Sequence, residues 1–205
     1  MNILFALAVG YQVYYANLHA HTSYSDGIGL PGQAYCYARD TARIDVLALT
    51  DHTHYLTPGT YRQEREIAES CTEPGRFVAL AGQEFGSLAQ FGHLSIYDAE
   101  SLCPVSTSDL AGFYNWLGEV QEPAQFNHPS LEDFGDFRYY RAADRYVTTI
   151  EVVNGSGLYT PVNEDKYLAA LRAGWHCAPV ANQDNHRGAW GNAPGANGQI
   201  PLTGI

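Results

Sequence analysis

The chain has 205 residues, of which 45% are hydrophobic and 13% aromatic, so it can form one globular domain with a sizeable core. Its 22 acidic and 11 basic residues give a formal net charge of −11. Because an acidic surface repels phosphate backbones, this charge argues against a nucleic-acid polymer as partner. We expect a single domain over residues 1–205.

The N-terminal segment, residues 1–12, is apolar over Met1–Gly10. It is too short to span a membrane and lacks the basic region of a signal peptide. We interpret it as a leading buried strand or the remainder of a trimmed leader. No membrane span is therefore expected, and the protein could be cytoplasmic or secreted after leader removal.

Apolar runs typical of strands alternate with helical stretches along the chain. The predicted strands are Val13–Leu18, Val46–Thr50, Phe77–Ala81, His93–Tyr97, Ala124–Phe126, Thr149–Val153 and Ala178–Ala181. The predicted helices are Gly32–Ala42, Tyr61–Cys71, Asp109–Val120 and Asn163–Ala173. Gly174 stands where the last helix should stop. This alternation predicts an α/β fold with parallel strands covered by helices, and seven strands favour a small barrel. Residues 188–205, rich in Gly and Asn, are expected to form a loop-rich tail.

The four cysteines, Cys36, Cys71, Cys103 and Cys177, form no CxxC pair, which argues against a zinc ribbon or a thioredoxin-like motif. Cys36 and Cys71 lie in two successive predicted helices. They could form a disulfide in an oxidising compartment, and the other interpretation is that they are buried free thiols.

Histidine and acidic side chains follow most of the predicted strands. Because the carboxyl ends of barrel strands meet at one mouth, these donors should converge there. The donors in chain order are His19 and His21, Asp51 and His52, Glu84, His128, and Asp184 and His186, while His93 opens its strand. Histidine and carboxylate together bind first-row transition metals, so the pattern indicates a multinuclear metal site.

The first motif is His19-Ala20-His21, in which two imidazoles on one side of an extended strand can reach one ion. Asp26 follows five residues after His21, within Ser25-Asp26-Gly27, and is predicted to be a further ligand. A simple turn is the alternative interpretation of this tripeptide.

The second motif is Asp51-His52, at the end of an apolar strand. We expect His52 to bind metal and Asp51 to accept a hydrogen bond from its ring, because metal-bound histidines need such an acceptor. A cap on the next loop explains Asp51 equally well. His54 is either a further donor or a residue of the substrate pocket or surface.

The reasons for predicting the remaining donors as ligands are simpler. A buried carboxylate at Glu84 would be costly unless it bridged cations. Asp184 and His186 repeat the alternate-residue geometry of the first motif, and Pro129 fixes the backbone after His128. His176 is interpreted as structural. The chain contains no GxSxG, P-loop, GxGxxG or HExxH motif.

Taken in order, these motifs resemble those of the PHP (polymerase and histidinol phosphatase) superfamily, over roughly residues 15 to 190. The opening Asn17–Gly27 resembles its branch of carbaryl-hydrolase-like metallohydrolases and small phosphoesterases. The resemblance implies a distorted seven-stranded (β/α) barrel that holds two or three divalent ions, commonly zinc, manganese or iron. It implies that one ion binds His19, His21, Glu84 and Asp184, that a second shares Glu84 and adds His93 and His128, and that the third binds Asp26, His52 and His186.

The expected function is metal-dependent hydrolysis. A water bridging two such cations loses a proton near neutral pH and is the expected nucleophile. Asp51 is a candidate orienting base, and His54 and Arg187 are candidate contacts to an anionic substrate; Arg187 could equally be a surface residue. We expect a phosphoesterase acting on a small phosphorylated molecule. The alternatives are a hydrolase of carbamates, amides or carboxylic esters, and a non-catalytic metal-binding module. The sequence leaves the oligomeric state open.

Overall fold

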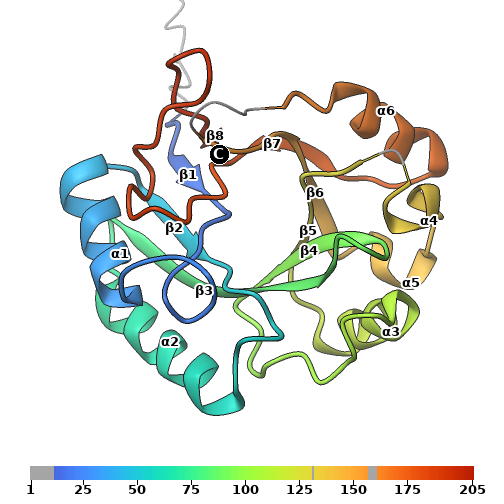
Figure 1. Ribbon diagram of the computed structural model, residues 1–205, viewed down its shortest axis with the longest axis horizontal. Coiled ribbons are helices and arrows are strands. Elements are labelled where there is room, and N and C mark those ends of the chain that lie inside the picture. Colours follow the sequence, from blue (N-terminus) through green and yellow to red (C-terminus); the bar gives the residue numbers. More distant parts are fainter. Residues whose placement is uncertain (1–11, 131, 157–160) are drawn as a thin grey trace, which may run out of the picture.

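The computed structural model describes residues 12–130, 132–156 and 161–205. Within these residues, eight strands form one sheet in the order β7-β6-β5-β4-β3-β2-β1-β8, which curls around the centre of the molecule (Figure 1). The strands are β1 (Tyr15–Asn17), β2 (Val46–Leu49), β3 (Val78–Ser87), β4 (Gly92–Tyr97), β5 (Ala124–Asn127), β6 (Val147–Val153), β7 (Ala178–Ala181) and β8 (Thr203–Gly204). All seven predicted strands are present, and β8 is an addition.

The two ends of the sheet meet between β7 and β8. The Thr203 hydroxyl donates to the carbonyl of Ala181 at 2.9 Å and accepts from its N–H at 3.1 Å. Further along, the N–H of Asp184 donates to the carbonyl of His19, which joins the chain after β7 to the chain after β1. The sheet is therefore a nearly closed barrel, and the predicted α/β barrel is confirmed.

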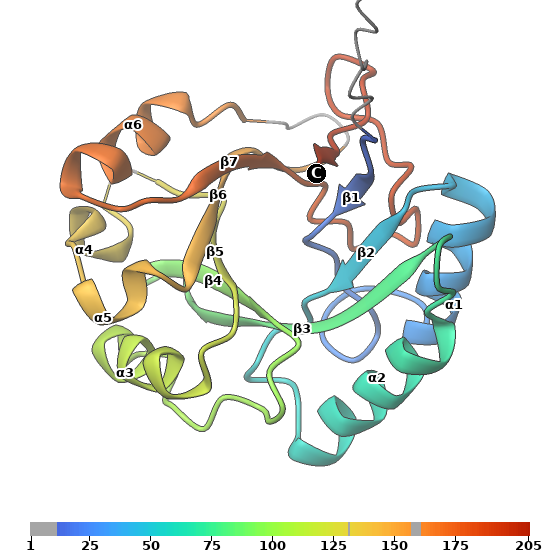
Figure 2. The ribbon, with the colours of Figure 1, turned by 180° about the vertical axis from the view of Figure 1, so that it is seen from behind.

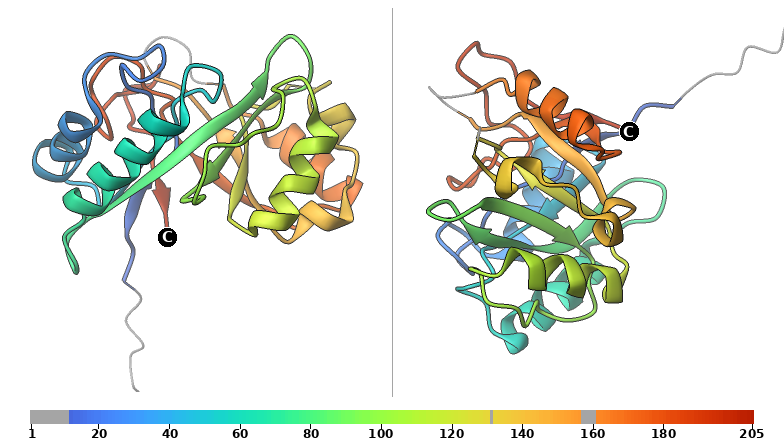
Figure 3. Two further views of the ribbon diagram at one scale, coloured as in Figure 1. Left: turned by 90° about the horizontal axis from the view of Figure 1, so that it is seen from below. Right: turned by 90° about the vertical axis from the view of Figure 1, so that its right-hand side faces the viewer.

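The strands are not all parallel, which differs from the sequence-based expectation. β4 runs antiparallel to both β3 and β5, and β8 runs antiparallel to β1. The reason is the short connection after Ser87, which leaves no room for a crossover helix and therefore makes β3 and β4 a hairpin. β3 is the long strand of Figure 3. Glu84 consequently lies inside β3, whereas the sequence pattern predicts it after the strand.

Helices cover the outer face of the barrel. They are α1 (Pro31–Tyr37), continued by the π-helical turn η1 (Ala38–Ala42), then α2 (Pro58–Cys71), α3 (Leu110–Val120), α4 (Phe134–Phe137), α5 (Arg141–Asp144) and α6 (Glu164–Ala173). α2 starts earlier than predicted because the Thr57 hydroxyl caps it, accepting from the N–H of Thr60. Gly174, with φ of 113°, ends α6 as predicted. The short α4 and α5 were not predicted.

Two apolar clusters pack the helices onto the sheet. One lies beneath α1 and α2 and includes Tyr35 and Leu47, and the other lies beneath α3–α6 and includes Phe113 and Trp175. Figure 2 shows the two groups of helices on opposite sides of the barrel. Because the apolar side chains face outward to the helices, polar side chains of the strands such as Gln125 fill the interior.

The segment after β7 is largely irregular and ends in β8. Trp190 anchors it, since this side chain is buried and its indole N–H donates to the carbonyl of His21 at 2.9 Å. At the other end of the chain, the predicted leading segment lies outside the described residues, apart from Gln12. No helix in the described ranges is long and apolar enough to cross a bilayer.

The four cysteines are all free thiols. Cys103 and Cys177 are buried, whereas Cys36 is exposed and Cys71 is half-buried. Of the two interpretations of Cys36 and Cys71, the free thiols are therefore the one observed, although the expectation that both are buried is wrong.

Candidate metal centre

The nine side chains predicted as metal ligands converge at one end of the barrel. They fall into four groups whose donor atoms lie within 4.8 Å of one another. The groups are His19, His21 and Asp184; His19, Glu84 and His128; His52, Glu84 and His93; and His21, Asp26, His52 and His186. The segments that follow β1, β2, β5 and β7 supply seven of them, as the strand-end pattern predicts, and the hairpin β3–β4 supplies Glu84 and His93.

Glu84 lies at the middle of the cluster and is almost completely buried. Its Oε1 atom lies 3.1 Å from His19 Nε2, 3.4 Å from His93 Nδ1 and 3.2 Å from His128 Nε2. Its Oε2 atom lies 3.3 Å from His21 Nε2 and 3.0 Å from His52 Nδ1. The two oxygens of one carboxylate thus face two different sets of imidazoles, which is the arrangement of a bridging ligand.

Asp184 completes the inner part of the cluster. Its Oδ1 lies 3.3 Å from His19 Nε2 and 3.1 Å from His21 Nε2. Asp184 and His128 both have a left-handed backbone, with φ of 46° and 27°. Residues other than glycine rarely adopt such backbone angles, and strained residues of this kind concentrate at functional sites.

The outer part of the cluster is the group around Asp26, on the loop after β1. The Asp26 carboxylate lies 3.2 Å from His186 Nε2, 3.7 Å from His52 Nε2 and 3.8 Å from His21 Nδ1. Gly27 shapes this loop: its N–H donates to the carbonyl of Thr22, and a Cβ at position 27 would overlap the backbone of His21. Asp26 itself is exposed, so this group faces solvent more than the others do.

The grouping differs in part from the one that the resemblance implies. We expected His93 and His128 to share a cation with Glu84. In the structure, His128 groups with His19 and Glu84, whereas His93 groups with His52 and Glu84. The expected set of Asp26, His52 and His186 is found together and gains His21.

Glu151, which the sequence analysis did not select, holds the inner ligands in place. It is fully buried on β6, and its Oε1 accepts from His19 Nδ1 at 2.9 Å. Its Oε2 accepts from the backbone N–H of His128 at 2.7 Å and from the Asn154 amide at 2.8 Å. With Nδ1 of His19 donating to Glu151, the lone pair of Nε2 is left for a metal.

Buried amides extend this network through the barrel. Asn127 donates to Glu84 Oε1 at 2.7 Å and to the Ser95 hydroxyl at 2.8 Å, and Gln125 donates to Asn127 at 2.8 Å. The signal that could have found these residues is the alternation of polar residues within strands: Gln125 and Asn127 in β5, and Thr149 and Glu151 in β6.

The charges of the cluster are strongly coupled. Burial by itself disfavours every charged form, but the carboxylates of Asp184, Glu84 and Glu151 outweigh it and raise the pKa of His19 well above its usual value. Burial by itself would lower the pKa of His128, but the Glu84 carboxylate outweighs it and raises this pKa to about 9. Burial by itself would raise the pKa of Glu84, but the surrounding histidines outweigh it and hold this pKa well below the usual range. The carboxylates therefore require positive charge beside them.

Three buried polar atoms of the cluster lie 3.0–3.4 Å from another donor atom of the cluster but make no hydrogen bond to the described residues. They are His52 Nδ1, His93 Nδ1 and Asp184 Oδ1. Such atoms are costly to bury unsatisfied. All three belong to the groups described above, and a divalent cation would satisfy them. The residues present therefore fit a metal, in donor type and in position.

The residues predicted to assist hydrolysis, Asp51, His54 and Arg187, lie in different places. Asp51 accepts from the N–H of Thr22 at 2.8 Å, from its hydroxyl at 2.6 Å, and from the Ser25 hydroxyl. The expected bond to His52 is not among its hydrogen bonds to described residues. The alternative, a cap on the loop that follows Asp51, is not observed either, because these partners lie on the earlier loop after β1. Arg187 is exposed beside His186. His176 pairs with Asp144 at 2.9 Å, and none of the four donor groups includes it.

A pocket of about 550 Å³ opens beside the outer group. Three of its lining residues, Asp26, His52 and His93, belong to the donor cluster. His54, for which the sequence leaves a donor, pocket or surface role open, also lines it. The cluster is therefore accessible to a small molecule.

Comparison with known proteins identifies the fold. The chain matches no family model, and no curated protein matches it. Among solved structures, it is similar to a two-domain protein from Bacteroides vulgatus described as containing a predicted PHP-like metal-dependent phosphoesterase. The TM-score is 0.64 at 20% identity, over 88% of this chain and 54% of that one. The chain thus spans about half the length of that protein.

Two further structures share the fold. An amidohydrolase from Chromobacterium violaceum, with bound sulfate and no metal, matches with a TM-score of 0.54 at 16% identity, over 84% of this chain and 87% of that one. A lesion-specific endonuclease from Pyrococcus furiosus matches with a TM-score of 0.51 at 11% identity, over 86% of this chain and 49% of that one. The barrel is therefore of the PHP type, and the resemblance seen in the sequence is confirmed for the fold.

Proposed function

We propose that the chain is a metal-dependent hydrolase that binds two or three divalent cations, zinc, manganese or iron, and cleaves a phosphoester of a small anionic molecule. The observation that carries this proposal is Glu84, whose two carboxylate oxygens face two sets of imidazoles. When bound, such cations supply an activated water and stabilise the charge that develops on the transferred group.

The residues of the chain divide this work. His19, His21 and Asp184 would hold one cation, and the group around Asp26 would hold the most exposed one, with Glu84 between the two sets. The buried network of Glu151 and Asn127 would keep the inner ligands oriented. Because Asp51 binds the loop that carries Asp26, we assign it a positioning role there.

Hydrolysis of a carbamate, amide or carboxylic ester is the second candidate. It is favoured by the pocket, since the described residues that line it include no lysine or arginine to pair with a phosphate. The similarity to an amidohydrolase points the same way. A purely structural metal site is disfavoured, because nine convergent donors exceed the roughly four that a closed structural site needs.

The test has two steps. The first is the metal content per chain, measured by plasma mass spectrometry on protein purified without chelators or an affinity tag. The second is hydrolysis by protein loaded with zinc, manganese or iron, on p-nitrophenyl phosphate, bis-p-nitrophenyl phosphate, p-nitrophenyl acetate, a p-nitrophenyl carbamate and duplex DNA with an abasic site. The DNA arm is included because the structural neighbours include endonucleases.

Two or three equivalents of metal with turnover of a phosphate substrate would support the leading proposal. Turnover of the acetate or carbamate alone would transfer the assignment to the second candidate. Cleavage of the DNA would overturn the expectation of a small-molecule substrate. Fewer than two equivalents after loading, with no turnover, would overturn the hydrolase assignment.

A further inference from the structure

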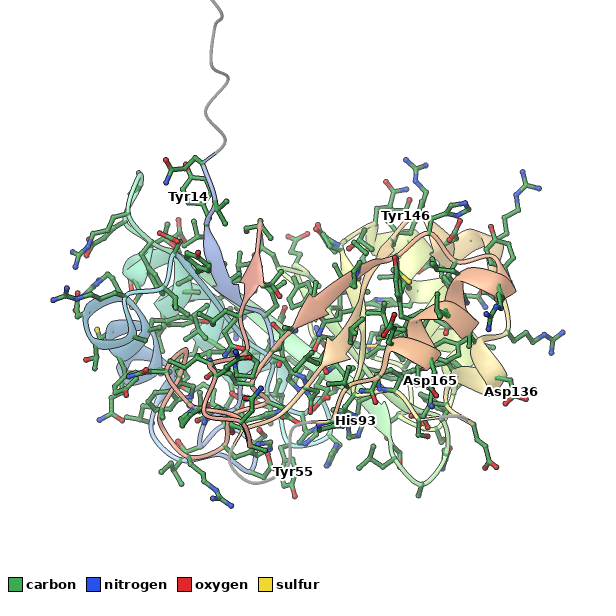
Figure 4. All side chains as sticks on the ribbon, turned by 90° about the horizontal axis from the view of Figure 1, so that it is seen from above. Tyr14, Tyr55, His93, Asp136, Tyr146 and Asp165 are labelled. Atoms are coloured by element: carbon green, nitrogen blue, oxygen red, sulfur yellow. The ribbon has the colours of Figure 1, made fainter. Side chains whose placement is uncertain are left out.

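Two free thiols lie on the outside of the barrel, apart from the metal centre. Cys36 is exposed on α1, and Cys71, the last residue of α2, is half-buried at the edge of the apolar cluster beneath these helices. None of the four donor groups includes a cysteine. Figure 4 shows His93 near the middle of the molecule and α1, in blue, at its left edge. The proposed function therefore does not account for these two thiols.

The packing of α1 on α2 places the two cysteines on facing turns. β1 and β2 pair in parallel and each is followed by its helix, so α1 and α2 run in the same direction, side by side (Figure 1). A Cβ added at Gly32 of α1 would meet the Ile67 side chain of α2 at 3.7 Å. Cys36 and Cys71 each follow these residues by four positions, which is one further turn on the same face of each helix.

An ion pair joins the two segments on the other side of the cysteines. Arg39 follows Cys36 by three residues, and its Nη1 lies 2.7 Å from Oε1 of Glu73. Glu73 in turn follows Cys71 by two residues. Nη2 of Arg39 donates to Asp40 at 2.8 Å and to the sulfur of Cys36 at 3.9 Å. The two cysteines are thus bracketed by an apolar contact and an ion pair, both of which hold the same two segments together.

The two sulfurs differ in their surroundings. The sulfur of Cys36 is open to solvent, so a small oxidant can reach it. Burial raises the pKa of the Cys71 thiol, and the Cys36 thiol beside it adds to this rise. Cys71 therefore remains a neutral thiol near neutral pH. This difference places Cys36 to react first and Cys71 to react second.

We infer that Cys36 and Cys71 are a reversible thiol pair that a peroxide oxidises to a disulfide, and that this disulfide ties α1 to α2. The structure shows the pair in its reduced form. The other two cysteines, Cys103 and Cys177, are buried in the second apolar cluster, where a small oxidant does not reach them. The inference goes beyond the proposed function and does not depend on it.

The oxidation takes two steps. In the first, the Cys36 thiolate attacks an oxygen of the peroxide: a sulfur–oxygen bond forms, the oxygen–oxygen bond breaks, and the departing hydroxide takes up a proton and becomes water. The sulfur loses two electrons, which the peroxide gains. In the second step, the Cys71 sulfur attacks the Cys36 sulfur, a sulfur–sulfur bond forms, and the oxygen leaves as water with the proton of the Cys71 thiol. Two external thiols reverse the change by supplying two electrons and two protons, and they become a disulfide themselves.

The disulfide should stabilise the protein. It would close the chain over residues 36–71, and a link across a segment of this length restricts the unfolded chain more than the folded one. We expect the oxidised protein to melt roughly 5–15 °C higher than the reduced protein.

The first test treats the protein with hydrogen peroxide after incubation with zinc, which has no redox chemistry of its own. We expect the intact mass to fall by the mass of two hydrogens and a peptide map to show Cys36 joined to Cys71. Dithiothreitol should reverse the change, and melting curves of the two forms measure the shift in Tm. A gain of oxygen without the loss of two hydrogens, a link to Cys103 or Cys177, or an unchanged Tm would overturn the inference.

The second test separates the roles of the two thiols. Cys71→Ser should hold the oxidation at Cys36 as a sulfenic acid, which dimedone traps. Cys36→Ser should form neither the disulfide nor a dimedone adduct at Cys71, and both variants should lose the rise in Tm. Cys177→Ala, which removes a thiol outside the pair, is the control and should still form the disulfide. If dimedone labels Cys71 in the Cys36→Ser protein as fast as it labels Cys36 in the Cys71→Ser protein, the order of the two steps is wrong and the inference is overturned.

Discussion

The imidazole of His19 donates from Nδ1 to Oε1 of Glu151 at 2.9 Å, and both side chains are fully buried. This pair links a donor after the first strand to a carboxylate on the sixth, 132 residues away in the sequence. Its effect is to fix both the ring plane and the tautomer of His19, so that Nε2 faces Glu84 and Asp184. Loss of Glu151 should therefore act through the metal rather than through direct contact with substrate.

The first prediction concerns this pair. Glu151→Ala and Glu151→Gln should lower metal affinity by about 10- to 100-fold, which is typical when the partner of a metal-bound histidine is removed. Hydrolysis should fall because the remaining metal is less well held. The measurement is metal affinity by competition with a chromophoric chelator, together with the visible spectrum of the cobalt-loaded protein, which reports ligand geometry directly.

A matched control is available for Glu151. Asp144 pairs with His176 at the same 2.9 Å distance, but neither residue belongs to the donor cluster. Asp144→Asn should leave metal affinity and the cobalt spectrum unchanged. Wild-type affinity in a folded Glu151→Ala protein would show that His19 needs no partner, and the positioning role would be withdrawn.

The second prediction concerns the centre of the cluster. Glu84→Gln and His19→Ala should each reduce hydrolysis by at least about 100-fold, because both remove stabilisation that acts on the transition state. The fold should largely survive, which circular dichroism checks. His176→Ala should leave turnover nearly unchanged, since its side chain is 80% exposed and lies outside the donor groups. Full activity in either cluster variant would contradict the assignment.

Much of this site could be predicted because its donors have a local signature. His19 and His21 alternate along an extended segment, and Asp184 and His186 do the same. Most of the predicted ligands lie at or near the mouth-facing end of a strand, so the barrel brings them together whatever path the connecting loops take. The fold followed from the same alternation of strands and helices.

Other features depend on contacts that the local sequence does not contain. Glu151 looks like an ordinary strand residue until His19 is placed against it. The antiparallel pairing of β4 was not predicted because the sequence of an apolar strand does not show whether it pairs parallel or antiparallel. Only the short link after Ser87 distinguishes a hairpin from a crossover. β8 has just two residues, and its position depends on pairing with β1. The sequence pairs Asp51 with its neighbour His52, but the tertiary structure places it against Thr22 and Ser25.

The third prediction concerns the loop that carries Asp26. A Cβ added at Gly27 would lie 2.7 Å from the backbone carbon of His21, which is too close for any real Cβ. Gly27→Ala should therefore shift the loop and weaken the outer group of donors, while the groups around Glu84 stay intact. We expect the loss of one metal equivalent from a protein that binds three, measured by plasma mass spectrometry after dialysis.

The control for Gly27 is a glycine in a helix. Gly32 lies in α1, and a Cβ there would meet its nearest neighbour at an ordinary 3.7 Å. Gly32→Ala should keep the full metal content and be neutral or stabilising by about 0.5–1 kcal/mol, since alanine favours a helix. Equal metal content in the two variants would show that the outer group does not depend on the shape of the loop.

The last prediction concerns Glu64 on α2, which is fully buried with no hydrogen-bond partner for either carboxylate oxygen among the described residues. Burial, and then the charge of Asp51, raises the pKa of Glu64 well above its usual value. Because the pKa of Glu64 is higher in the folded state, its neutral form contributes its full stability below the unfolded pKa of about 4.3. The stability of the folded protein then falls as pH rises through the raised pKa.

Glu64→Gln cannot ionise, so it should raise the Tm at pH 8 and have a smaller effect at pH 5, with about 2–4 °C for each kcal/mol. Melting curves at both pH values measure this, with Glu69→Gln, an exposed position on the same helix, as control. A change in Tm that is the same at both pH values would mean that Glu64 does not ionise in this range, and the prediction would be wrong.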